Sequence, residues 1–321
     1  MTKLSTYSSG QPFSGTLVVR ECSIRQASNN KNYLALRLTD GETDITGRVW
    51  DHTGGPPAVN SVIFVKSNLG EYKGQPQLSI TGWRQARPDE YSPADFLPVC
   101  PVDREELKKK LREHIENVRD PGLSQLLNTL FKGDKEFVKS YLNAPAAVYH
   151  HHAYLGGLLH HTVGVIDRCL SLATPETDAD LLVVGAILHD VGKIYDYDWS
   201  GLVINMTGSG RLLGHITQGI MLVDRYAKNC SELSPGRLSL LLHLIASHHG
   251  KLEWGSPVEP CTLEAVLLHQ ADYLDMQLFK LELARNQVPE GETWGKVPGF
   301  SRQFWFGGGA ETEGSLNKEK V

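Results

Sequence analysis

The sequence predicts an α+β protein of two domains, a small closed β-barrel of five strands followed by an all-α domain. Its 321 residues fit about two domains at ~150 residues each. Short β-branched or aromatic runs separated by turn residues fill the first part of the chain, whereas apolar residues recur at helical spacing in the second. The apolar fraction of 40% and the charged fraction of 21% are ordinary for globular proteins and exclude wholesale disorder.

The expected barrel lies within residues 12–86. Pairs such as Asp40-Gly41 and Lys73-Gly74 mark turns between the β-branched runs. A β-sandwich usually needs about seven strands, so five short strands favour a closed barrel. The expected strands are residues 16–20, 33–38, 44–50, 62–65 and 77–81.

Four prolines mark residues 87–102 as a linker between the two domains. Just beyond it, Asp103 followed by Glu106 has the spacing of a capping box at a helix N-terminus. The predicted division is a barrel domain (1–86), the linker (87–102), a helical domain (103–300) and a disordered tail (301–321). Further helices are expected at residues 123–131, 136–142, 158–172, 180–189, 214–228, 237–248 and 262–285.

The sequence predicts a reduced, cytoplasmic protein with no membrane partner. Its longest nearly unbroken apolar run, residues 181–188, is well short of the ~20 residues that span a bilayer. The N-terminal segment lacks the apolar core of a signal peptide. The five cysteines are scattered and form no CxxC pair, which argues against a disulfide framework and a thiolate zinc site.

The net charge of −5 is unevenly divided between the two parts of the chain. Residues 1–86 carry +3 and the remainder carries −8. A mildly basic binding module followed by an acidic, metal-using module would produce this division, and chance variation explains it equally well.

Histidines are frequent and concentrated in the helical part, with twelve of the thirteen after residue 113. His189-Asp190 and His248-His249 each end an apolar helical run, where a side chain can face a cavity at the edge of the core. Together with His161, His215 and Asp272 on neighbouring helices, they offer nitrogen and oxygen donors. Such donors suit Mn²⁺, Fe²⁺, Co²⁺ or Zn²⁺ without any sulfur ligand.

This pattern resembles the HD-domain phosphohydrolase superfamily. The resemblance rests on the segments GGLLHHT, LHDVGK, LLGHIT, SHHGKLEWGSP and HQADYLD. With a barrel in front that is similar to an OB-fold (DGETDITGRVWD), residues 12–285 resemble the YhaM-type 3′-5′ exoribonucleases. One departure is visible: Ala153 follows the run His150-His151-His152 where an acidic residue is expected, which leaves the role of that run open.

The resemblance implies two divalent cations, with manganese favoured and cobalt, iron and zinc as alternatives. Asp190 is expected to be shared by both ions and, with Lys193, to be catalytic; the lysine ammonium could pair with a substrate phosphate or stabilise charge in the transition state. The expected ligands of one ion are His161, His189, Asp190 and Asp272. The expected ligands of the other ion are Asp190, His215, His248 and His249.

The expected substrate is single-stranded RNA, with single-stranded DNA as an alternative, cleaved to nucleoside 5′-monophosphates. An OB-fold binds single strands through cations and aromatic platforms. Asp275, one helical turn from Asp272, is expected to orient a ligand histidine or to bind ribose. The substrate-binding candidates are Arg48, Tyr72, Lys73, Trp254 and Asp275.

Two other functions fit the same residues. The first is an HD phosphohydrolase that acts on a small nucleotide or cyclic dinucleotide, with a purely structural barrel. The second is a non-catalytic single-strand binder with a vestigial HD domain, which the intact set of ligand residues argues against. Dependence of hydrolysis on polymer length separates the first from the exonuclease. The sequence leaves open whether the chain forms a homo-oligomer.

Overall fold

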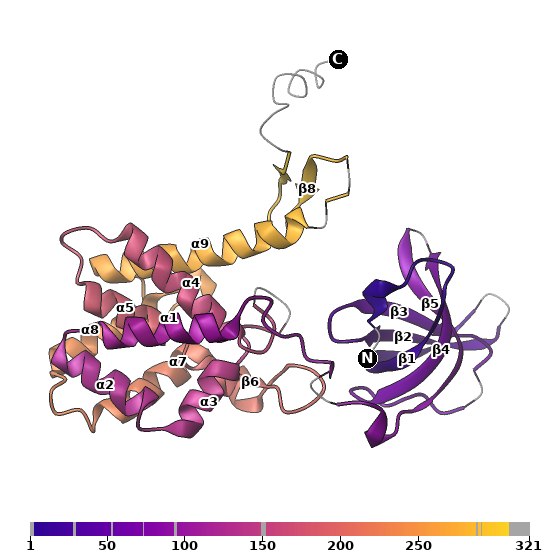
Figure 1. Ribbon diagram of the computed structural model, residues 1–321, viewed down its shortest axis with the longest axis horizontal. Coiled ribbons are helices and arrows are strands. Elements are labelled where there is room, and N and C mark those ends of the chain that lie inside the picture. Colours follow the sequence, from indigo (N-terminus) through magenta and orange to yellow (C-terminus); the bar gives the residue numbers. More distant parts are fainter. Residues whose placement is uncertain are drawn as a thin grey trace, which may run out of the picture.

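A computed structural model describes residues 3–27, 30–52, 54–72, 74–92, 95–148, 152–286, 288–289 and 291–307. It has the predicted class: a closed β-barrel is followed by a helical part, and the two lie side by side (Figure 1). Among the described residues, no helix combines the length and the apolar character needed to cross a membrane.

The five predicted strands are confirmed, and most of them are longer than expected. They close in the order β1-β2-β3-β5-β4, with β3 and β5 parallel and the other pairs antiparallel. Their inward residues, such as Leu17, Leu38 and Ile63, are fully buried and form the barrel core. The strands are β1 (Pro12–Gln26), β2 (Asn32–Thr39), β3 (Asp44–Val49), β4 (Val62–Tyr72) and β5 (Gln75–Gln85).

The linker is docked at several points along its length. Phe96 is fully buried, and its backbone lies 2.4 Å from where a Cβ on Gly41 would stand, so that glycine is required there. Val99 forms a parallel bridge to Leu155, and the Cys100 amide donates to the Leu155 carbonyl at 3.1 Å. The linker therefore contacts both the barrel and the segment that leads into the first histidine helix.

The helices lie where the sequence predicts them. Most begin at an aspartate, serine or threonine whose side chain accepts a hydrogen bond from the first turn, as Asp103 does from Glu105. The longer helices are α1 (Arg104–Glu116), α2 (Pro121–Phe131), α3 (Lys135–Asn143), α4 (Gly157–Leu172), α5 (Ala179–Leu188), α7 (Gly208–Ala227), α8 (Pro235–Ser247) and α9 (Leu263–Arg285). The short helical segments are η1 (Leu4–Thr6), η2 (Pro88–Glu90), α6 (Lys193–Asp196) and η4 (Leu252–Trp254).

Helix α5 lies inside the helical part. All residues of its apolar run, 181–188, are buried, and it packs against α4, α8 and α9. A helix that is apolar all round is expected in such a central position. The polar residues that follow its C-terminus therefore emerge in the middle of the bundle.

Two small hairpins are not predicted from the sequence. In the first, β6 (Tyr197–Asp198) pairs with β7 (Asn205–Met206), and Val203 between them joins a buried cluster with barrel residues Val18 and Val62. In the second, β8 (Trp294–Lys296) pairs with β9 (Gln303–Trp305) at the end of α9 (Figure 1). Strand β9 thus lies beyond residue 301, where the sequence places the start of the tail. Residues 308–321 lie outside the described part.

Candidate metal centre and adjoining cavity

The His189-Asp190 pair lies directly after α5. His189 is the C-terminal cap of that helix, and both side chains are buried. The turn that follows requires glycine at position 192, because a Cβ there would lie 2.0 Å from the His215 carbonyl oxygen. Gly192 thus allows α7 to approach closely and brings His215 towards Asp190.

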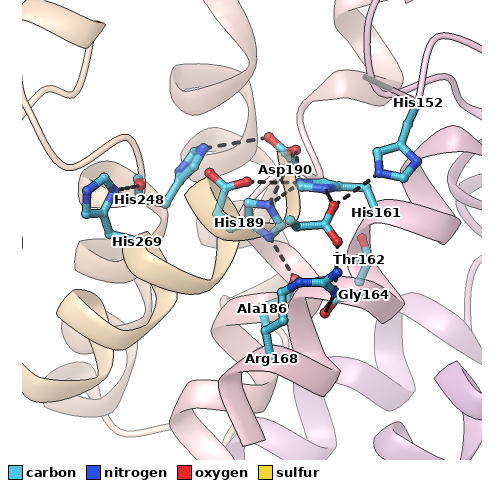
Figure 2. A network of polar contacts seen from close by, with 12 residues as sticks. His152, His161, Thr162, Gly164, Arg168, Ala186, His189, Asp190, His248 and His269 are labelled. Carbon is cyan, nitrogen blue, oxygen red and sulfur yellow. Dashed lines mark hydrogen bonds and ion pairs between the residues drawn. The ribbon is translucent and has the colours of Figure 1, made fainter. Parts of the chain in front are cut away.

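Asp190 faces two groups of histidines with its two carboxylate oxygens. Its Oδ2 lies 3.3 Å from His161 Nε2 and 3.4 Å from His189 Nε2. Its Oδ1 lies 3.3 Å from His215 Nε2 and 3.6 Å from His248 Nε2. Figure 2 shows His161 and His248 approaching this carboxylate from opposite sides. One carboxylate so placed can bridge two cations.

The first group consists of His161, His189 and Asp272, whose donor atoms lie within 4.8 Å of one another. His161 Nε2 is 3.1 Å from Asp272 Oδ1 and 3.2 Å from His189 Nε2. His189 Nδ1 lies 2.8 Å from the carbonyl oxygen of Ala186, which can only accept a hydrogen bond. The proton of a neutral His189 is therefore on Nδ1, and its Nε2 lone pair is free for a cation.

The second group consists of His215, His248 and His249, whose donor atoms also lie within 4.8 Å of one another. His248 Nδ1 is 2.7 Å from the Ile245 carbonyl, which again leaves Nε2 for a ligand bond. His215 follows a kink in α7 at Gly214, where φ is +70° and ψ is 157°. That left-handed φ favours glycine and turns the start of the second half of α7 towards Asp190.

Buried polar atoms without partners support a cation at this place. Asp190 Oδ1, His215 Nε2 and His248 Nε2 are buried and have no hydrogen-bond partner among the described residues. Leaving such atoms unsatisfied costs roughly 1–3 kcal/mol each. A divalent cation would satisfy all three, so the residues present fit a metal centre of nitrogen and oxygen donors.

The electrostatics keep Asp190 and His248 in forms that can bind a cation. Burial opposes the ionisation of Asp190, but Lys193 and His189 outweigh it and hold the pKa of the carboxyl well below its usual range. Burial, helped by His189, lowers the pKa of His248 well below its ordinary value. Asp190 is therefore an anion and His248 a neutral ligand.

Lys193 begins α6, one turn after the aspartate. Its ammonium lies 2.6 Å from Asp190 Oδ2 and is largely buried. It also lines a cavity of about 320 Å³ that opens beside the centre. The ammonium of Lys193 can therefore reach an anionic group that binds next to Asp190.

One part of the cavity wall is aromatic. Trp254 and Tyr273 stack with ring centroids 5.4 Å apart at 25°, and the Lys251 ammonium lies 4.6 Å from the Trp254 ring centre. His269 and Met276 complete the wall. Trp254 is predicted from the sequence; the other three wall residues are not, although their positions on α9 beside Asp272 are a usable signal.

Asp275 lies behind His161. Its Oδ2 is 2.8 Å from His161 Nδ1, and its Oδ1 is 2.9 Å from Arg168 Nη1. It is 4% exposed, and its close approach to α4 depends on Gly164, where a Cβ would lie 2.4 Å from Oδ1. Orientation of a ligand histidine, one of its two expected roles, agrees with this position better than contact with ribose.

The barrel carries its own aromatic and cationic surface. The Arg48 guanidinium lies over three rings, 4.7 Å from the centre of Tyr72 and 5.5 Å from those of Tyr33 and Trp50. Tyr72 and Trp50 are each 48% exposed. Arg48 and Tyr72 are thus brought together as one surface, whereas Lys73 lies outside the described residues.

Fold and site together define a metal-dependent hydrolase of the HD class, and comparison with known proteins agrees. Residues 158–277 match the HD domain family. The chain is 36% identical to the 3′-5′ exoribonuclease YhaM of Oceanobacillus iheyensis over 88% of this chain and 90% of that protein. It is 32% identical to the protein of the same name from Geobacillus sp. (strain WCH70), over 94% and 93%. The chain belongs to the YhaM family.

Proposed function

We propose that this chain removes nucleotides one at a time from the 3′ end of single-stranded RNA and releases nucleoside 5′-monophosphates. The observation that carries the proposal is the cavity of about 320 Å³, which is lined both by Asp190 and Lys193 and by the stacked rings of Trp254 and Tyr273. That volume is at the small end of ligand pockets and suits a terminal nucleotide. The YhaM relatives are named as 3′-5′ exoribonucleases.

Two divalent cations fit the proposal, and Asp190 would be shared between them. His161, His189 and Asp272 would hold the first ion. His215, His248 and His249 would hold the second. Manganese suits this set of imidazole and carboxylate donors, as do iron, cobalt and zinc. When bound, such a pair lowers the pKa of water towards neutrality and neutralises charge on the phosphodiester.

The chain's own residues orient the substrate around that centre. The terminal base is expected to stack on the wall of Trp254 and Tyr273, which holds the sugar and phosphate towards Asp190. Lys193, already buried beside the aspartate, is expected to stabilise negative charge that develops on the phosphate. The base displaces water from the cavity as it enters, and the loss of water strengthens the electrostatic interactions inside the cavity.

The barrel is expected to hold the strand upstream of the cleaved end. The surface formed by Arg48, Tyr33, Trp50 and Tyr72 combines a cation with exposed rings. Bases stack on such rings without regard to sequence, and phosphates pair with such cations. One polymeric substrate would then occupy both domains.

A time course with a 5′-labelled oligoribonucleotide tests the proposal. With Mn²⁺ the label is expected to pass through a ladder of products that shorten from the 3′ end, and EDTA should stop the reaction. A matched oligodeoxynucleotide shows whether DNA is also cleaved. Hydrolysis of a cyclic dinucleotide with no cleavage of the oligonucleotide would contradict the proposal and favour a small-nucleotide phosphohydrolase.

A further inference from the structure

The last histidine of the run before α4 is buried next to the proposed metal centre. His152 is 3% exposed and has a φ of +55°, which residues other than glycine adopt rarely. Its ring packs against that of Phe279, with centroids 4.2 Å apart. Such a backbone conformation in a buried segment is often retained where the side chain must be placed in one way.

Hydrogen bonds join His152 to the ligand His161 through a single carboxylate oxygen. Asp275 Oδ2 lies 2.8 Å from His161 Nδ1 and 3.1 Å from His152 Nε2. On its other side, His152 Nδ1 lies 2.7 Å from the hydroxyl of Tyr154. That hydroxyl is 2.6 Å from His160 Nδ1. We call these five residues the Tyr154 chain; Figure 2 shows its His152 and His161 rings.

When His152 is neutral, one arrangement of protons satisfies the four hydrogen bonds of the Tyr154 chain. The ionised carboxylate of Asp275 can only accept, so His161 Nδ1 and His152 Nε2 must both donate to it. A neutral His152 then offers a lone pair at Nδ1, to which the Tyr154 hydroxyl gives its single proton. That hydroxyl oxygen therefore accepts from His160 Nδ1.

We propose that His152 and Tyr154 are positioning residues for the metal centre, and that they act through Asp275 on His161. They hold the carboxylate so that it binds the Nδ1 proton of His161 and leaves the Nε2 lone pair directed at the centre. Partners beyond the ligands commonly fix the tautomer of a ligand histidine in this way. This inference rests on the metal centre proposed above and assigns a role to His152.

A third cation held by His152, His161 and Asp275 is the competing interpretation, because their donor atoms also lie within 4.8 Å of one another. The bonds of 2.8 and 3.1 Å to one carboxylate oxygen argue against it. Those distances are in the range of N–H···O hydrogen bonds, and a carboxylate that only accepts requires a proton on each ring nitrogen. A protonated nitrogen cannot bind a cation.

The tautomer of His152 tests the chain without metal or substrate. In the metal-free, full-length protein, nitrogen-15 NMR of the histidine rings is expected to show His152 neutral, with its proton on Nε2. Tyr154→Phe removes the hydroxyl that donates to Nδ1 and should convert part of the population to the other tautomer. A wild-type His152 with its proton on Nδ1 overturns the proposal.

Calorimetric titration with Mn²⁺ tests the consequence for the centre. His152→Leu should weaken one of two bound ions by about ten- to a hundredfold and leave the other unchanged. Tyr154→Phe should weaken the same ion by less, and His152→Gln should recover part of the loss, since the amide nitrogen of glutamine can replace Nε2–H. The matched control is Tyr226→Phe, which removes a tyrosine hydrogen bond to Asp134 outside the chain.

Each outcome separates the two proposals. Unchanged affinity in His152→Leu and Tyr154→Phe overturns the positioning role, and so does a third equivalent of Mn²⁺ that is lost in His152→Leu. If the wild-type protein binds no Mn²⁺, the proposed metal centre fails, and with it the positioning role; the His152 tautomer then still shows whether the chain itself is present.

Discussion

At the scale of single residues, Asp190 joins the two halves of the centre. Its two oxygens face different histidine groups, and its remaining close contact is the ammonium of Lys193 at 2.6 Å. Burial raises the pKa of this carboxyl and favours its neutral form, whereas Lys193 and the histidines lower the pKa and favour the anion. The anion prevails because the ammonium of Lys193 is also buried and poorly screened.

The substitution Asp190→Asn tests the bridging role. The amide keeps the volume of the side chain but removes a charge that both cations would share. We expect turnover to fall more than about a hundredfold and the Mn²⁺ content to drop towards zero. Binding of a single-stranded RNA should persist, because the barrel surface is unchanged. Near-wild-type hydrolysis would exclude Asp190 from the reaction.

The substitution Lys193→Met separates charge stabilisation from metal binding. Methionine fills most of the same buried space without the ammonium. Turnover at saturating RNA is expected to fall about a hundredfold, the usual effect of losing one group that stabilises transition-state charge. The affinity for Mn²⁺ should not weaken, because the substitution removes the positive charge of Lys193, which would repel a metal ion bound at Asp190. Unchanged turnover would limit Lys193 to a structural contact.

The sequence could predict the donors but not their surroundings. His161, His189-Asp190 and Asp272 were found because their residue types and neighbouring apolar runs suit metal ligands. Tyr273 was missed because an aromatic residue on an apolar helix is usually part of a core. Its contact with Trp254 depends on how a distant loop packs against α9, which no local pattern encodes.

At the scale of elements, the ends of the helices position the donor residues of the proposed metal centre. Arg237 at the start of α8 ties three of them together, because it donates to Asp120 at 2.9 Å and to Asp178. Those aspartates are the N-terminal caps of α2 and α5. The helix that ends at the metal centre is thus anchored at its opposite end by a charge-assisted clamp.

Arg237→Met should lower the free energy of unfolding by about 1–2 kcal/mol at pH 7, at the lower end for charged hydrogen bonds because Asp178 is partly exposed. Arg237 is the main cause that lowers the pKa of Asp178. A carboxyl with a lowered folded pKa stabilises above its unfolded value and loses that contribution as the pH falls through the folded pKa.

The difference between Arg237→Met and wild type should therefore shrink below about pH 4, the ordinary pKa of an aspartate. Urea unfolding at several pH values measures it. The control is Arg302→Met, which removes a cation–π contact with the ring of Phe304 and should show no such trend. A pH-independent difference for Arg237→Met would refute the clamp.

Elements were predictable in proportion to their length. The strands and long helices have clear periodicity and capping residues, so their order was found along the whole chain. The two-stranded hairpins were not, because strands of two or three residues have no periodicity to detect. Trp294 and Trp305 face each other across the second hairpin, a pairing that only the fold brings about.

At the scale of the whole molecule, the two domains are expected to act on one strand. The barrel is mildly basic and the helical part acidic, so phosphate contacts upstream of the cleavage site should come mainly from the barrel. The loop between β6 and β7, which follows Lys193 closely, packs into a cluster with barrel residues. A short stretch of chain after Lys193 therefore packs against the barrel.

The double substitution Trp50→Ala, Tyr72→Ala in the full-length chain tests this division. Loss of two stacking rings, at ~1–3 kcal/mol per base, should raise the KM for a 20-residue oligoribonucleotide by about tenfold or more. The KM for a dinucleotide, which is too short to reach the barrel, should not change. Adding Arg48→Ala should also reduce the dependence of KM on salt. An unchanged KM for the long substrate would restrict the barrel to a structural role.

Mn²⁺ titration of the metal-free protein tests most directly whether hydrolysis of RNA requires two cations, which Asp190 would share. Bound Mn²⁺ and released nucleoside 5′-monophosphate would be measured together on one oligoribonucleotide. We expect two equivalents of Mn²⁺ to bind per chain, and release of nucleoside 5′-monophosphate to begin as the second equivalent binds. Full activity with one equivalent, or release of product in the absence of metal, would contradict this expectation.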